Sequence, residues 1–142
     1  MDDPIALARA CADALWAEDR ASQGLGIVLT EVAPGRARMS MRITAAMVNG
    51  HGICHGGFIF MLADSAFAFA CNSHGERAVA QHNAITFLRP GRLGETLIAE
   101  AMERARSVRS GIYDVRVTGD DGSIVAEMRG QSRLSGGKFF PE

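Results

Sequence analysis

The sequence predicts an α+β fold in which one antiparallel β-sheet wraps around a single long central α-helix. The strongest sign is an apolar run from Phe58 to Cys71 that is interrupted only by Asp64 and Ser65. This run is shorter than the roughly 20 residues that a membrane-spanning helix requires, so we expect a helix buried inside the fold. The segments on both sides of it follow the two-residue alternation of half-buried strands. A length of 142 residues corresponds to one domain that can bury a core without disulfides.

The composition is that of a globular protein and excludes several classes of partner. The chain has 15 basic and 16 acidic residues, a net charge of −1, and 47% hydrophobic residues. Because duplex nucleic acid is bound by an excess of basic charge, we expect no nucleic-acid partner. The acidic start at Asp2 and Asp3 does not fit a signal peptide, and no membrane partner is expected. An odd count of three cysteines, without a C-x-x-C pair, predicts a reduced, cytoplasmic protein.

The first half of the chain predicts a helix followed by a hairpin. An N-terminal helix is expected over residues 1–22, since Asp3 can cap it, Pro4 suits its first turn, and apolar residues recur every three or four positions. Residues 25–33 are β-prone and end at the turn signal Pro34-Gly35. Residues 36–43 then alternate strictly between apolar and polar side chains, which indicates a second, antiparallel strand.

The second half predicts the central helix and four further strands. A polar, glycine-rich loop from Thr44 to His55 leads into a helix over 56–74, and Gly75 follows as its C′ residue. The later strands are expected at residues 78–88, 95–106, 110–118 and 123–134. Ala105 is a candidate for the inner face of the second of them, and Asp120-Asp121-Gly122 is a hairpin turn signal. Six strands leave sheet edges to cover, so we expect the chain to self-associate.

Asp64 is the most informative single residue. It lies on the apolar helix between Ala63 and Ser65. A carboxylate in that position costs several kcal/mol of desolvation unless it is paired or faces a wet cleft. One explanation is a structural aspartate bonded to backbone or serine. The other is a functional carboxylate, which the sequence before the helix favours.

The segment from Asn49 to Gly57 contains an amide, two imidazoles, a thiol and four glycines. Gly56 and Gly57 begin the helix, where backbone N–H groups lack intrahelical partners beside the positive end of the dipole. Such N–H groups can form an oxyanion hole. Asp64 lies about 10 Å further along the helix axis, too far to act easily on the same carbonyl. The spacing therefore predicts a site between two subunits, with a carboxylate from the second chain.

Two other uses of these residues are less favourable. His51, Cys54, His55 and His74 match no standard zinc spacing, so no metal site is expected. Cys54 and His55 are adjacent, and neighbours on an extended stretch point to opposite faces, which disfavours a nucleophile–base pair. His51 on its own fits a surface histidine of the loop.

The stretch Asn49 to Gly57, followed by Asp64 to Ala68, resembles the hot-dog-fold acyl-CoA thioesterases. The similarity is greatest to the PaaI-type thioesterases of phenylacetic acid degradation. Phe87 to Gly91 and the glycine-rich end from Arg129 to Gly137 also resemble that group. The resemblance covers nearly the whole chain, and the more specific part is the HGG motif at 55–57 with Asp64 after six further residues. It implies a single hot-dog thioesterase domain over residues 1–142.

The resemblance implies hydrolysis of an aryl-acetyl-CoA, such as phenylacetyl-CoA or hydroxyphenylacetyl-CoA. Asp64 would be the nucleophile or the general base that activates water. The backbone N–H of Gly56, helped by Gly57, would polarise the thioester carbonyl. His55 would orient that region or contact the thioester, and Asn49 would help to hold the thioester or the attacking group.

Further roles follow from the same resemblance. Ser65 would bond the carboxylate or the substrate, and Gln81 or Asn83 would replace the water-binding serine that some relatives carry. Arg89 is the first candidate for binding the phosphates of coenzyme A, followed by Arg106, Arg109 and Lys138, although each arginine also fits a solvated strand end. The apolar side chains of Phe58, Met61 and Phe67 suit either an acyl pocket or the core.

The resemblance implies no cofactor, because coenzyme A is part of the substrate, and a homotetramer built as a dimer of dimers. Two alternatives remain. An enoyl-thioester hydratase of the same fold would pair a histidine with a carboxylate, as His55 and Asp64 could. A non-catalytic acyl-CoA-binding subunit would bind the same ligands without turnover.

Overall fold

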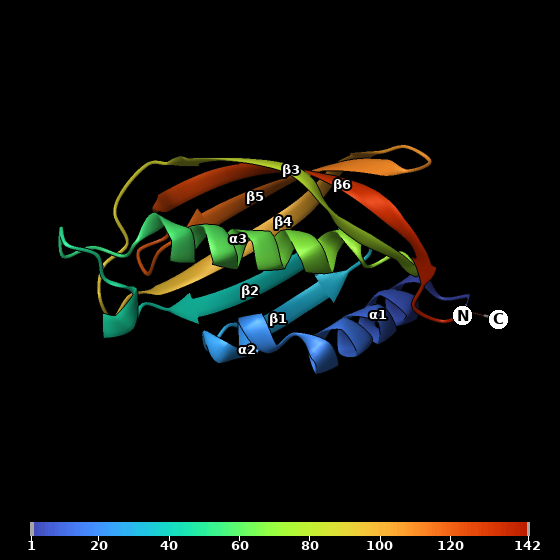
Figure 1. The fold of residues 1–142 in the computed structure, drawn as a ribbon, viewed down its shortest axis with the longest axis horizontal. Coiled ribbons are helices and arrows are strands. Elements are labelled where there is room, and N and C mark those ends of the chain that lie inside the picture. The colour runs from blue at the N-terminus through green and yellow to red at the C-terminus, as the bar shows by residue number, and fades with distance from the viewer. Residues whose placement is uncertain (1, 142) are drawn as a thin grey trace.

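Six antiparallel strands form one curved sheet around the long helix α3, as predicted (Figure 1). The computed structural model describes residues 2–141. The order of strands in the sheet is β1-β2-β4-β5-β6-β3. Their bounds are β1 Val28–Ala33, β2 Arg36–Arg42, β3 Glu76–Phe87, β4 Thr96–Arg106, β5 Ser110–Thr118 and β6 Ile124–Lys138. All the helices lie on one side of the sheet (Figure 1).

The alternating strands bury their apolar side chains against α3, as the sequence pattern requires. Strand β2 buries Ala37, Met39 and Met41 and exposes its arginines, and it pairs with β1 as the predicted hairpin. Strand β5 buries Tyr113, Val115 and Val117 on the same inner face. The core is therefore the space between the inner face of the sheet and the helix.

Helix α3 spans Gly56–Cys71 and is buried on nearly all sides. His55 caps its N-terminus, since the ring Nδ1 accepts a hydrogen bond from the backbone N–H of Gly57. The helix ends before residue 74, the predicted end, because the side chain of Asn72 bonds to the backbone of Ala68 and of Ala78. The prediction of Gly75 as the C′ residue is wrong, because Asn72 is the C-cap and Ser73 follows it. Gly75 lies in the turn before β3, with φ of 96°.

The prediction of one N-terminal helix over residues 1–22 is wrong. Helix α1, Pro4–Glu18, is followed by a separate short helix α2, Arg20–Gly24. The break lies at Asp19, whose carboxylate accepts the backbone N–H of Ser22 and so caps α2. Residue 1 lies outside the described part of the chain. Helix α1 packs on α3 and β1, with the Trp16 ring 6.0 Å from that of Phe69.

Two strand boundaries and the direction of one side chain also differ from prediction. Strand β1 begins at Val28 because Gly26 adopts a positive φ of 71° in the turn before it. Ala105 is exposed rather than inward, since a bulge between Glu103 and Ala105 shifts the register of β4. Strand β6 continues to Lys138, because it pairs with the start of β3.

Strand β3 forms one edge of the sheet (Figure 1). It pairs with β6 on one side, and within residues 2–141 nothing pairs with its other side. Most of its side chains are exposed, among them Val79 and Phe87. A long strand edge of this kind is open to pairing with another chain. Each helix in the described range is too short or too polar to cross a membrane.

Candidate active site

Asp64 lies in the middle of α3 and is half buried. Its Oδ1 accepts a hydrogen bond of 2.8 Å from the side-chain amide of Asn83 on β3. Burial raises the pKa of the Asp64 carboxyl above its ordinary value, and the bond from Asn83 offsets part of that rise. The site thus holds a desolvated carboxylate with one amide donor, which suits a group that must accept a proton or attack a carbon.

Asn83 reaches Asp64 because the neighbouring position on β6 is Gly130. A Cβ on Gly130 would lie 2.8 Å from the Asn83 Oδ1 and 2.9 Å from the Phe67 ring. The Oδ1 itself is buried and makes no hydrogen bond within the described chain. Asn83 was a candidate in the sequence only as a substitute for a water-binding serine. Its bond to Asp64 depends on the pairing of β3 with β6, which no local pattern reveals.

The first two backbone N–H groups of α3 differ in their hydrogen bonds. The N–H of Gly57 donates to Nδ1 of His55 at 2.9 Å and is thereby occupied. The N–H of Gly56 has no hydrogen-bond partner in residues 2–141. Of the two amides predicted for an oxyanion hole, the structure leaves that of Gly56 available, at the positive end of the helix dipole.

The loop before α3 is held by its own asparagine. The Oδ1 of Asn49 accepts the backbone N–H groups of His51 at 2.9 Å and Ile53 at 3.3 Å. The side-chain NH₂ of Asn49 makes no bond within residues 2–141. The backbone N–H of His55 donates to the carbonyl of Met47 at 2.7 Å. Asn49 and His55 therefore order the segment that carries Gly56.

Two of the predicted site residues lie elsewhere. Ser65 is buried and its Oγ is 2.8 Å from the Oγ of Ser22 in α2, so it joins two helices instead of bonding Asp64. Arg89 forms an ion pair with Glu95, 2.6 Å between the nearest atoms. Neither side chain comes together with Asp64. The three candidates for the acyl pocket differ in burial. Phe67 is fully buried in the core, whereas Phe58 and Met61 are partly exposed at the boundary of the core.

The cysteine and histidine side chains of the described residues form no metal-binding cluster. All three cysteines are free and buried, and burial raises the pKa of the Cys54 thiol. Nowhere in residues 2–141 do three His, Cys, Asp or Glu side chains meet in a way that could hold a metal ion. His74 lies 2.8 Å from Glu103, at the other end of α3 from His55.

The candidate residues therefore form two groups on one helix. Asn49, His55 and Gly56 lie at its N-terminus, and Asp64 lies with Asn83 about 12 Å further along the axis. An amide and a carboxylate at that distance cannot both contact one small carbonyl group. Within one chain, the Asp64 carboxylate and the Gly56 amide therefore lie in two separate places on α3.

Comparisons with known proteins give a consistent result. Residues 51–126 match the Thioesterase superfamily. The acyl-coenzyme A thioesterase PaaI of Escherichia coli (strain K12) is 44% identical over 131 residues, which are 92% of this chain and 94% of that protein. The solved structure of E. coli PaaI, from the phenylacetic acid degradation operon, has a TM-score of 0.94 at 42% identity, covering 96% of this chain and 99% of that chain.

Two further solved structures are similar. A mutant of the phenylacetic acid degradation protein PaaI from Thermus thermophilus has a TM-score of 0.77 at 36% identity, covering 80% of this chain and 96% of that chain. The protein smu.793 from Streptococcus mutans UA159, bound to acetyl CoA, has a TM-score of 0.76 at 25% identity, covering 79% of this chain and 90% of that chain.

Proposed function

The chain belongs to the thioesterase superfamily, and on that premise we propose which thioesters it hydrolyses. The proposed substrates are aryl-acetyl-CoA thioesters, such as phenylacetyl-CoA or hydroxyphenylacetyl-CoA. The hot-dog fold and the thioesterase activity follow from the family. The aryl-acetyl substrate rests on the similarity to PaaI proteins of phenylacetic acid degradation. The observation that carries the mechanism is the half-buried Asp64 carboxylate, which accepts a hydrogen bond from the side-chain amide of Asn83.

Asp64 supplies the reactive oxygen by one of two routes. As a general base it takes a proton from water, and the hydroxyl oxygen attacks the thioester carbon as the C–S bond breaks and coenzyme A leaves as the thiol. As a nucleophile its carboxylate attacks that carbon directly and expels coenzyme A as the thiolate, which gives a mixed anhydride. Water then hydrolyses the anhydride, which releases the acid and regenerates the Asp64 carboxylate, and one of the released protons converts the thiolate to the thiol. In either route the raised pKa makes the ionised carboxylate a stronger base than an exposed aspartate.

The N–H of Gly56 stabilises the negative charge on the carbonyl oxygen. The sequence predicts the Gly56 and Gly57 amides as donors. In the described chain the Gly57 N–H donates to Nδ1 of His55, whereas the Gly56 N–H has no partner. Removing one oxyanion donor typically costs a factor of about 100 to 1,000 in kcat. The capping bond of His55 keeps the first turn of α3 in place, so His55 acts on the site through the backbone.

Two chains complete each site. The exposed edge of β3 can pair with β3 of a second copy about a twofold axis. This pairing lays the two α3 helices antiparallel beside each other, so that the N-terminus of one approaches the middle of the other. Asp64 of one chain and the Gly56 amide of the other then face one thioester. The outer face of the sheet, free of helices, is available to join two such dimers into the homotetramer (Figure 1).

The substrate is an acyl-CoA and no separate cofactor is required. Support comes from the structure of smu.793, which holds acetyl CoA. The relatives named as acyl-coenzyme A thioesterases favour hydrolysis over hydration of an enoyl thioester and over binding without turnover.

A thiol-release assay over a panel of acyl-CoA esters tests this function. We expect free coenzyme A to appear fastest with phenylacetyl-CoA and hydroxyphenylacetyl-CoA, and more slowly with straight-chain esters. Hydration of crotonyl-CoA, followed by loss of its ultraviolet absorbance, is the matched test for the hydratase. Binding of acyl-CoA without thiol release or hydration would indicate the non-catalytic subunit.

A further inference from the structure

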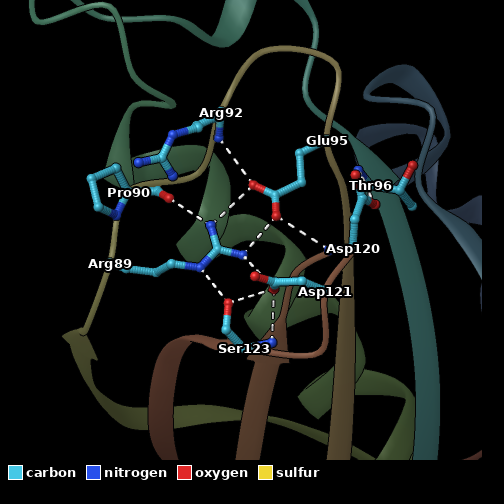
Figure 2. A network of polar contacts seen from close by, with 8 residues as sticks. All are labelled: Arg89, Pro90, Arg92, Glu95, Thr96, Asp120, Asp121 and Ser123. Carbon is cyan, nitrogen blue, oxygen red and sulfur yellow. Dashed lines mark hydrogen bonds and ion pairs between the residues drawn. The ribbon is translucent and has the colours of Figure 1, made fainter.

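Arg89, just after β3, uses every nitrogen of its guanidinium group in one cluster of contacts (Figure 2). The Nε donates to Ser123 Oγ at 2.7 Å, and Nη1 donates to the carbonyl of Pro90 at 2.8 Å. The two Nη atoms also bind the two carboxylate oxygens of Glu95, at 3.1 and 2.6 Å. Nη2 also lies 3.5 Å from Asp121 Oδ1. This arrangement leaves no free edge for a phosphate.

Glu95 makes further hydrogen bonds in this cluster. Its carboxylate also accepts the backbone N–H groups of Arg92 and Asp120, both at 3.2 Å. The Arg89 side chain is 21% exposed and that of Glu95 is 11% exposed, so the pair is largely shielded from solvent. Arg89 holds the pKa of the Glu95 carboxyl below its ordinary value. The pair lies directly over Gly119, where any Cβ would overlap both side chains.

The cluster fixes both ends of the 88–95 loop, and that loop contacts the segment before α3. Inside the loop, the carbonyl of Gly91 accepts the backbone N–H of Cys54 at 2.9 Å. A Cβ on Gly91 would lie 3.3 Å from the Cβ of Cys54, so the two backbones are in close contact. Cys54 is two residues before Gly56, whose N–H is the proposed oxyanion donor.

A second contact reaches Gly56 from the last residue of β3, directly before the loop. Phe87, two residues before Arg89, lies with its ring against the backbone of Gly56, where an added Cβ would be 2.9 Å from the ring. The loop and the N-terminus of α3 lie at the same end of the molecule (Figure 1). The position of Gly56 is thus set from two sides, by the bond from Cys54 to Gly91 and by the Phe87 ring.

We propose that Arg89 and Glu95 are positioning residues, which hold the 88–95 loop so that the Gly56 amide is aimed at the thioester oxygen. This inference rests on the proposed function. It replaces the role in binding coenzyme A phosphates that the sequence suggested for Arg89. A displacement of about 1 Å in such a group costs a factor of about 100 in rate, so a rigid ion pair outside the site can matter for catalysis.

The two roles of Arg89 predict opposite effects of Glu95→Gln. If Arg89 positions the loop, Arg89→Gln and Glu95→Gln both break the cluster and both lower kcat. If Arg89 binds a phosphate, Glu95→Gln frees the guanidinium, so that KM for the CoA ester stays the same or falls. Gly119→Ala, which forces the pair apart without removing a charge, should behave like the two cluster variants.

The test measures kcat and KM for phenylacetyl-CoA and for the N-acetylcysteamine thioester of the same acyl group, which carries no phosphate. We expect Arg89→Gln and Glu95→Gln to lower kcat at least about tenfold on both substrates. This decrease is smaller than the one expected when an oxyanion donor is removed altogether. Arg9→Gln is the control, since Arg9 is exposed on α1 and lies outside both the cluster and the outer face of the sheet. It should leave both constants unchanged.

Hydrogen exchange supplies a readout without turnover. The Cys54 amide should exchange faster in both cluster variants, while the amide of Val115 in the core stays protected. A rise in KM confined to the CoA ester, or unchanged kcat with unchanged Cys54 exchange, would overturn the positioning role. A wild-type protein that releases no thiol from any ester would instead overturn the proposed function, and the exchange of Cys54 would still report whether the cluster holds the loop.

Discussion

Asp64 has an environment that a structural aspartate does not need. A carboxylate kept only for stability is normally well supplied with donors, whereas within residues 2–141 the side chain of Asp64 has one hydrogen bond, from Asn83, and its pKa is raised. We expect Asp64→Asn to keep the fold and to lower kcat at least about a hundredfold, because the amide neither attacks nor accepts a proton. Steady-state thiol release measures this, with circular dichroism to confirm folding. Turnover near that of wild type would remove Asp64 from the mechanism.

The same variant has a predictable effect on stability. Because burial raises the folded-state pKa of Asp64, the contribution of this one group to stability is greatest below the ordinary aspartate pKa and is lost as pH rises through the raised value. Asparagine does not titrate, so Asp64→Asn should gain stability relative to wild type across that window. Urea unfolding at a series of pH values checks the direction. A difference that does not change with pH would mean that the carboxylate is not desolvated.

Asn83 should lower the pKa of the Asp64 carboxyl that it contacts. Its amide donates to the ionised form of Asp64 and therefore lowers the pKa of that group. In Asn83→Ala the pKa should rise further, and the acidic limb of the pH profile of kcat/KM should move to higher pH. Gln81→Ala, an exposed change on the same strand, is the control and should leave the profile in place. An unmoved limb in Asn83→Ala would show that another donor supports the carboxylate.

At the scale of elements, the start of α3 depends on a close contact with β3. A methyl group on Gly56 would lie 2.9 Å from the Phe87 ring. Gly56→Ala should therefore displace the first turn and lower kcat/KM roughly tenfold or more, and a second change, Phe87→Leu, should restore part of it. Gly50→Ala is the matched control, because nothing lies within 4 Å of that position. Equal activity of Gly56→Ala and wild type would mean that the contact does not control the amide.

The order of the elements could be predicted because each depends on a local pattern. The alternation in β2 and the apolar run of α3 are visible in any short window of the sequence. The break at Asp19 was missed because an aspartate inside an amphipathic pattern also fits an exposed helix position. It acts as a cap because its carboxylate binds the Ser22 backbone.

The site was predictable only in part. Asp64 and Gly56 follow from a charge on an apolar helix and from glycine at a helix start. The contacts of Ser65 and Arg89 could not be predicted, since their partners Ser22 and Glu95 are brought together by tertiary packing. A hydroxyl beside a carboxylate in sequence points about 100° away from it on a helix.

For the whole molecule, a site shared between two chains requires that one chain alone be inactive. The Asp64 carboxylate and the Gly56 amide are too far apart within one α3, and the open edge of β3 is the surface through which a second copy would supply the missing part. Assembly and activity should therefore be lost together. We therefore propose that each site takes its carboxylate from one chain and its oxyanion donor from the other.

Mixed dimers test that claim most directly. One chain carries Asp64→Asn and the other Gly56→Pro, which deletes the N–H at the first position of α3, where proline suits the backbone. Each variant should be inactive alone. In dimers purified through two different tags, one site holds both lesions and the other neither, so we expect about half of the wild-type activity. Folded mixed dimers without activity would show that carboxylate and amide act from the same chain, and would contradict the account.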